Sequence, residues 1–179
     1  MKRIKPVLLL ATLLASSLGY AQTEQSFAPD YLFISGSLKY GKECTVTLVH
    51  ENVAINNDLG HMFLQSAAKV MPDAMTAINI APNDSCMQQL LKNKLAYRLI
   101  GTPDNAEGTV LANSDTADGA AKGVGIRLSD RTGALIPVGG TLAAGIGNTP
   151  LLITLVKLKG QNQEPGTVKG TLTVEIERL

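Results

Sequence analysis

The sequence predicts an all-β fold, built as an antiparallel sandwich. Short runs of branched and apolar residues recur along the chain, and each run is bounded by Gly, Pro, Asn or Asp. The aromatic fraction is 4% with no Trp, and no stretch shows the length and period of a long amphipathic helix. Short strands joined by turns favour a sandwich over alternating strand–helix units.

The elements follow from these runs in order. The first predicted strand covers residues 31–39, and the second covers residues 44–55. Residues 59–75 show no clean period, so we expect a loop or a short helical turn there. A helix of about two turns is expected in residues 85–95, with Ser85 as its possible N-cap. Further strands are predicted at 77–81, 94–101, 108–113, 123–130, 134–140, 150–160 and 166–179.

The start of the chain has the pattern of a targeting segment. Three basic residues precede an apolar run at 7–14, and the small residues Gly19 and Ala21 follow at the usual cleavage spacing. Residues 1–21 are therefore predicted to be a secretory signal peptide, too short to span a membrane stably. The remaining chain has the length of one domain, with thirteen basic and fifteen acidic residues. This balance implies no nucleic-acid partner.

The two cysteines, Cys44 and Cys86, predict one structural disulfide in an exported chain. Closing a loop of roughly 43 residues would stabilise the fold by about 4 kcal/mol on the chain-entropy model. A metal pair lacks nearby ligands, because His50 and His61 stand alone. A redox dithiol would need a short CxxC spacing, which is absent.

The glycine-rich pieces and the polar residues do not predict catalysis. GVGIRL and AAGIGNTP lack the glycine order of nucleotide-binding loops, so turns and close strand packing explain them better. There is no nucleophile elbow, and Asp130 is predicted to hydrogen-bond the backbone of its own turn. We expect no catalytic residue, no metal and no cofactor, and hence no enzymatic activity.

The last stretch, residues 166–179, alternates like a strand with one buried face. Leu172, Val174 and Ile176 are its apolar positions. A terminal strand needs a neighbour on each side, or its backbone groups stay unpaired at the sheet edge. The sequence therefore raises the question of what covers the last strand.

Three features together resemble the pilins of chaperone–usher fimbriae of the type 1-like group. These are the run from 120 to 140 that contains GVGIRLSDRTG, the GxLxxxxxC pattern from Gly36 to Cys44, and Gly166 standing fourteenth from the carboxyl end. The resemblance implies an immunoglobulin-like sandwich that lacks its seventh strand. An open groove beside the final strand would be filled first by a chaperone and then by the amino-terminal extension of another subunit.

The resemblance also implies which residues form the two halves of the contact. Residues 22–34 would be the donor extension and residues 35–179 the incomplete domain. The groove, where the chaperone also binds, would be formed by Gly166, Leu172, Val174 and Ile176. The inserted face of the donor would carry Leu32, Ile34, Gly36 and Leu38, a choice favoured because glycine leaves room where the groove is shallow. The opposite parity would insert Phe27, Tyr31 and Phe33 instead.

The expected function is that of a structural fimbrial subunit that contributes to cell adhesion. Its implied partners are a periplasmic pilus chaperone, an outer-membrane usher and other pilin subunits, and the chain would pass through the periplasm to a fimbrium on the cell surface. One departure is Arg178 at the next-to-last position, where the family usually has an aromatic residue. The alternative is a self-contained secreted β-sandwich binding module whose last strand pairs within the chain.

Overall fold

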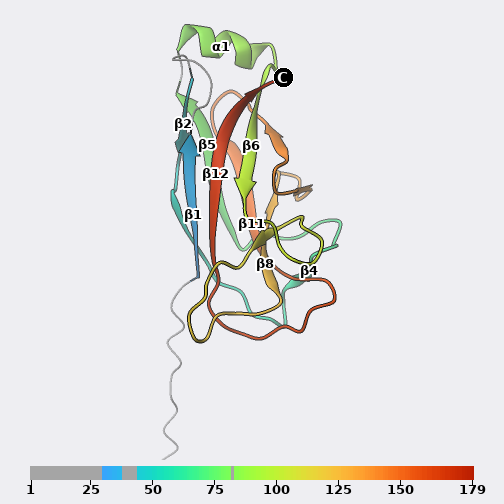
Figure 1. Ribbon diagram of the computed structural model, residues 1–179. Coiled ribbons are helices and arrows are strands. Elements are labelled where there is room, and N and C mark those ends of the chain that lie inside the picture. The colour runs from blue at the N-terminus through green and yellow to red at the C-terminus, as the bar shows by residue number, and fades with distance from the viewer. Residues whose placement is uncertain (1–29, 38–43, 82) are drawn as a thin grey trace, which may run out of the picture.

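The computed structural model describes residues 30–37, 44–81 and 83–179, and it confirms an all-β sandwich of two sheets (Figure 1). The predicted signal peptide lies outside these residues. The strands are β1 (Asp30–Ser37), β2 (Thr45–Leu48), β3 (Asn52–Ile55), β4 (Phe63–Leu64), β5 (Ala74–Ala81), β6 (Leu95–Gly101), β7 (Leu111–Ala112), β8 (Val124–Ser129), β9 (Leu135–Ile136), β10 (Thr141–Ala143), β11 (Thr149–Lys157) and β12 (Lys169–Arg178).

The two sheets share one apolar core. The first sheet has the order β10-β6-β12-β1-β3, and the second has the order β2-β5-β11-β8-β7, with β4 beside β11 and β9 beside β8. The alternating positions of β12 face inward as predicted, and Leu172 and Val174 are fully buried. They meet residues of β8 and β11 from the other sheet, such as Ile126 and Leu151, which are also fully buried.

The predicted strand at 44–55 is in fact two strands that belong to different sheets. β2 pairs with β5 in the second sheet, whereas β3 pairs with β1 in the first. The chain crosses between the sheets at 49–51, where the amide of Val49 donates to the carbonyl of Ala77 and the carbonyl of Glu51 accepts from the amide of Ile34. The apolar alternation on both sides of this crossing hides it from a sequence reading.

One helix is present in the described residues, α1 (Asp84–Leu91), and it has the predicted length of about two turns. Its N-cap is Asn83 and not Ser85, because the Asn83 side chain accepts a hydrogen bond of 2.8 Å from the amide of Cys86. Asn is as good a cap as Ser, so composition alone does not choose between them. Cys86 forms the predicted disulfide with Cys44.

Residues 59–73 contain β4, which pairs with β11, and turns but no helix, and the turns after β4 cover part of the outer face of the second sheet. A fully buried arginine, Arg127 of β8, fixes this cover. Its guanidinium donates to the carbonyls of Ala67 at 2.6 Å and Gly133 at 3.2 Å. Burial lowers the pKa of Arg127, and the carbonyl oxygens compensate the buried charge. The predicted turn role of Asp130 is confirmed, because its carboxylate accepts from the amides of Thr132 and Ala134.

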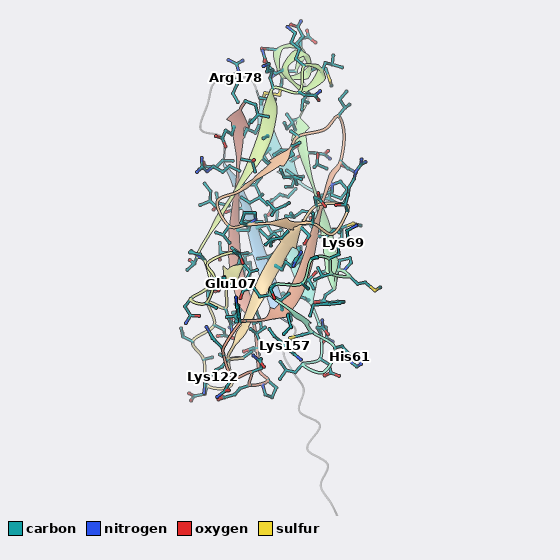
Figure 2. The ribbon with its side chains drawn as sticks, turned by 90° about the vertical axis from the view of Figure 1, so that its right-hand side faces the viewer. His61, Lys69, Glu107, Lys122, Lys157 and Arg178 are labelled. Atoms are coloured by element: carbon teal, nitrogen blue, oxygen red, sulfur yellow. A yellow bond between two sulfur atoms is a disulfide. The ribbon has the colours of Figure 1, made fainter. Side chains whose placement is uncertain are left out.

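The charged side chains are spread over the length of the sandwich. Figure 2 shows Arg178 at the end near α1, Lys122 at the opposite end and Lys69 between them. Within residues 30–37, 44–81 and 83–179, no three His, Cys, Asp or Glu side chains are placed to hold a metal ion. No helix in these ranges is long and apolar enough to cross a membrane.

Replacing Cys44 with Ser should sharply reduce the amount of folded protein. The disulfide closes a loop with a sequence separation of 42, so its loss should lower the free energy of unfolding by about 2–5 kcal/mol. Urea unfolding measures this loss, with Thr47→Ser on the exposed face of β2 as the control variant. A Cys44→Ser variant as stable as the parent chain would contradict a structural role for the disulfide.

Candidate functional site

The strand at the amino-terminal end of the described chain lies directly beside the strand at the carboxyl end. β1 pairs in parallel with β12, from Tyr31 opposite Lys169 to Ser37 opposite Glu175. On its other side, β1 pairs antiparallel with β3. Figure 1 shows β1 and β12 side by side. We call the contact between β1 and β12 the seam.

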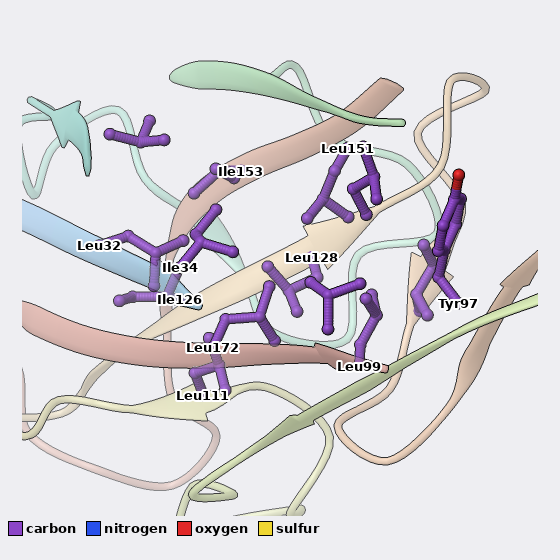
Figure 3. Packing of buried hydrophobic residues seen from close by; sticks show 14 of the residues in the cluster. Leu32, Ile34, Tyr97, Leu99, Leu111, Ile126, Leu128, Leu151, Ile153 and Leu172 are labelled. Atoms are coloured by element: carbon purple, nitrogen blue, oxygen red, sulfur yellow. The ribbon is translucent and has the colours of Figure 1, made fainter. Parts of the chain in front are cut away.

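The core-facing side of the seam brings together the two sets of residues that the sequence singled out. Ile34 lies opposite Leu172, and Gly36 lies opposite Val174. Leu32 is fully buried and Ile34 is 4% exposed (Figure 3). Burying these two side chains contributes about 3–6 kcal/mol in total. Ile176, the last apolar position of β12, is also buried but lies beyond the described end of β1.

The outward side of β1 carries the alternative set of candidate donor side chains. Tyr31 and Phe33 are 36% and 48% exposed, and their ring centroids lie 6.4 Å apart. The Ser35 hydroxyl lies 3.3 Å from that of Thr173 on the same outer face. Within this chain, therefore, Leu32 and Ile34 face the core, and Tyr31 and Phe33 do not. Phe27 and Leu38 lie outside the described residues.

The seam differs from the sequence expectation in one respect. We expected the edge of the last strand to be left for another chain, and the segment ahead of Cys44 to be one that its own sandwich does not need. In the structure, β12 is flanked by β6 on one side and by β1 of the same chain on the other. The physical reason is that an unpaired edge and an apolar groove are costly, and the nearest apolar strand is tethered to the same domain.

A polar clamp holds the beginning of the seam. The carboxylate of Asp115 accepts hydrogen bonds from the Thr167 hydroxyl at 2.5 Å and from the Lys169 ammonium at 3.1 Å. The amide of Lys169 donates to the side chain of Asn113 at 2.9 Å. The backbone beside the clamp is joined to β1, because the amide of Tyr31 donates to the carbonyl of Val168 at 3.2 Å. The clamp thus fixes where β12 begins and where β1 joins it.

The clamp lowers the pKa of Asp115. The hydrogen bond from Thr167, the amide of Ala117 and the nearby Lys169 together lower the pKa of Asp115 to about 2. Each of these contacts favours the ionised carboxylate. The sequence reading missed the clamp, because its members are separated by about fifty residues and lack a common motif.

Gly166 lies just before β12, in a place where the chain passes very close to a neighbouring loop. A Cβ atom there would collide with the carbonyl oxygen of Gly119 and lie 2.5 Å from the amide nitrogen of Ala121. Gly166 therefore acts by allowing a close approach of the two backbones, outside the seam itself.

Comparison with known proteins finds one family model, described as Fimbrial protein, that matches residues 33–177. The matched range includes most of β1, the whole of the strands from β2 to β11 and nearly all of β12. No curated protein matches the chain.

Replacing Ile34 with Asp should destabilise the fold, whereas Phe33→Asp should have little effect. The first change places a carboxylate in the buried seam, which costs at least about 3 kcal/mol, and the second places it on the exposed face of the same strand. Urea unfolding of both variants gives the comparison. Equal loss in the two variants would contradict the parity seen in β1.

The clamp should give the fold a specific acid sensitivity. Because the pKa of Asp115 is about 2 in the fold and 3.8 in its reference state, its contribution is present above about pH 4 and is lost as the pH falls towards 2. Asp115→Asn should remove this part of the acid unfolding curve, measured by circular dichroism. Asp118→Asn, at an exposed position nearby, is the control. An Asp115→Asn curve that matches the parent between pH 4 and 2 would refute the role of the clamp.

Proposed function

Because the chain belongs to the Fimbrial protein family, and is thus a structural subunit of a pilus, we propose that it polymerises by donor-strand exchange. In this proposal, the segment that includes β1 leaves the seam of its own subunit and enters the equivalent position in another copy. The seam is the observation that carries the proposal. It joins an apolar amino-terminal strand to the carboxyl-terminal strand by backbone pairing and by alternate side chains, which is how strand addition achieves affinity and specificity.

β1 is suited to an exchange between copies, because only a short segment of the sequence joins it to the rest of the domain. Residues 38–43 lead from β1 to Cys44, which is fixed to α1 by the disulfide. An equivalent strand from another copy would satisfy the same β12 edge and supply the same apolar side chains. Such an exchange of an identical element between copies is a low-cost route to assembly.

The tether also explains why assembly would need a chaperone. A strand held by a short linker has a high effective concentration at its own groove, so the lone chain fills the seam from within. A periplasmic chaperone that occupies the groove would prevent this closure, and an outer-membrane usher would then direct the exchange. In this proposal the signal peptide at 1–21 directs export, and the chain passes through the periplasm, where the two partners act on it. On the cell surface it has other pilin subunits as neighbours and contributes to adhesion.

The same closure favours a second candidate function. A chain whose β1 pairs with its own β12 needs no second copy at that edge, so the alternative function is a self-contained secreted β-sandwich binding module without polymerisation. The two functions differ in one physical requirement. Polymerisation by exchange requires β1 to leave β12, whereas a self-contained module requires it to stay.

A disulfide lock across the seam tests this requirement. Ser35 and Thr173 are opposite each other on the outer face, with hydroxyl oxygens 3.3 Å apart, so the pair Ser35→Cys and Thr173→Cys should cross-link within one chain. We expect the double variant to fold but to form no polymer on the cell surface, because β1 can no longer leave. Peptide mapping would verify that positions 35 and 173 are joined.

The two single variants are the matched controls, since each adds a thiol without the cross-link. They should polymerise like the parent chain, as judged by electron microscopy and by ladders on gels. Locked chains that polymerise as well as the single variants would rule out exchange of β1. A parent chain that is exported, remains monomeric and is never found with a chaperone would favour the self-contained module.

A further inference from the structure

The second residue of β12 in the seam is a glycine, Gly170, and the backbone does not require a glycine there. Seven glycines in the described residues have a left-handed φ, between 61° and 92°, and Gly170 is not among them. Glycine in a strand interior costs roughly 0.5–1 kcal/mol relative to alanine, because it loses more conformational freedom and packs no side chain. A residue with a side chain would therefore be expected at this position unless the space is needed by something else.

The space above Gly170 is occupied by side chains from two other strands. A Cβ atom on Gly170 would lie 2.5 Å from Cδ1 of Ile126 and 3.2 Å from Cδ1 of Leu32. Ile126 reaches in from β8 of the facing sheet, and Leu32 comes from β1, directly opposite Gly170 in the seam. Both side chains are fully buried, and Figure 3 shows them together in the core. The missing side chain of Gly170 thus leaves a space, which we call the pocket, that Ile126 enters most closely and that Leu32 shares from the opposite strand.

The sizes of the paired residues change in opposite directions along the seam. Leu32 on β1 faces Gly170 on β12, and further along the seam Gly36 on β1 faces Val174 on β12. If β1 slipped by two residues along β12, the same face of β1 would stay inward, but large and small residues would no longer lie opposite each other. In one direction the slip would place Leu32 opposite Leu172, and it would take Leu32 away from the space at Gly170 that it now shares with Ile126. The observed register is the one that brings Leu32 into the pocket.

We propose that Gly170, with Ile126 as the wall of its pocket, selects the strand that this subunit accepts beside β12 and fixes its register. The pocket admits a leucine-sized side chain at the position of Leu32. For a strand that comes from a second copy of this chain, the inference rests on the proposed function; for β1 within one chain, it does not. Gly170 is a specificity-determining residue that acts through the space it leaves.

A double-mutant cycle in the full processed chain tests the pocket itself. Leu32→Ala alone should lower the folding equilibrium constant by about thirtyfold or more, and Gly170→Ala alone by about fivefold or more, because it overpacks the site. In the combined variant, Ile126 has room to move into the volume that Leu32 has left. The combined loss should therefore be at least about fivefold smaller than the product of the single losses.

The control cycle combines Gly170→Ala with Phe33→Ala, a truncation on the same strand but on its exposed face. The loss in folding equilibrium constant of the combined variant should equal the product of the two single losses within about twofold, as expected for residues that share no partner. If the losses in the cycle of Leu32→Ala and Gly170→Ala also multiply, as in the control, the space at Gly170 is not coupled to Leu32 and the proposal is wrong.

A co-expression experiment tests selection between copies. One tagged copy carries Gly170→Ala, and a second, differently tagged copy carries either Leu32→Ala or no change. Polymers isolated through the first tag should contain at least about fivefold more of the Leu32→Ala copy than of the unchanged copy, since the smaller side chain suits the filled pocket. Equal incorporation would overturn selection in the polymer. If unchanged copies form no polymer at all, the proposed function fails, and the single-chain cycle still decides whether Gly170 fixes the register of β1.

Discussion

The backbone pairing of β12 is the constraint on which the rest of the structure depends. As a strand inside a sheet, β12 presents hydrogen-bonding groups along both edges, and leaving either edge bare inside an apolar groove is costly. β6 covers one edge and β1 covers the other. The core follows from this arrangement, because Leu32 and Ile34 enter the sandwich only when β1 lies beside β12. The chain thus covers both edges of β12 with its own strands.

The clamp and the crossing of the chain between the sheets place the two partners of this pairing. Asp115 and Asn113 hold the beginning of β12, while the crossing at 49–51 puts β3 in the first sheet, where it forms the second neighbour of β1. β1 is therefore held between a strand from the middle of the sheet and a short strand at its edge. This explains why the side chains of Leu32 and Ile34 are well buried.

The sequence predicted the features that follow from local alternation, from helix length and from the presence of only two cysteines. The inward positions of 166–179, the pairing of Cys44 with Cys86 and the two-turn helix are all present in the structure. The features it did not predict depend on contacts between distant residues. Residues 31–34 of β1 are apolar at every position, so the sequence does not show which face of β1 is buried, which strand β1 joins or whether that strand belongs to the same chain. The crossing at 49–51 is hidden because both halves of 44–55 have apolar alternation. Gly170 left one usable signal, since an isolated glycine in a strand pattern suggests a close approach.

The disulfide has a consequence for how the subunit would carry a mechanical load. A pull on β1 passes through the six residues that follow it to Cys44, and from there through a covalent bond to Cys86 in α1. α1 directly precedes β6, the other neighbour of β12. Tension on β1 is thus delivered by covalent bonds to α1, the element that leads into β6. Under traction the load would therefore enter the domain through a covalent bond at the helix that precedes β6, and not through hydrogen bonds alone.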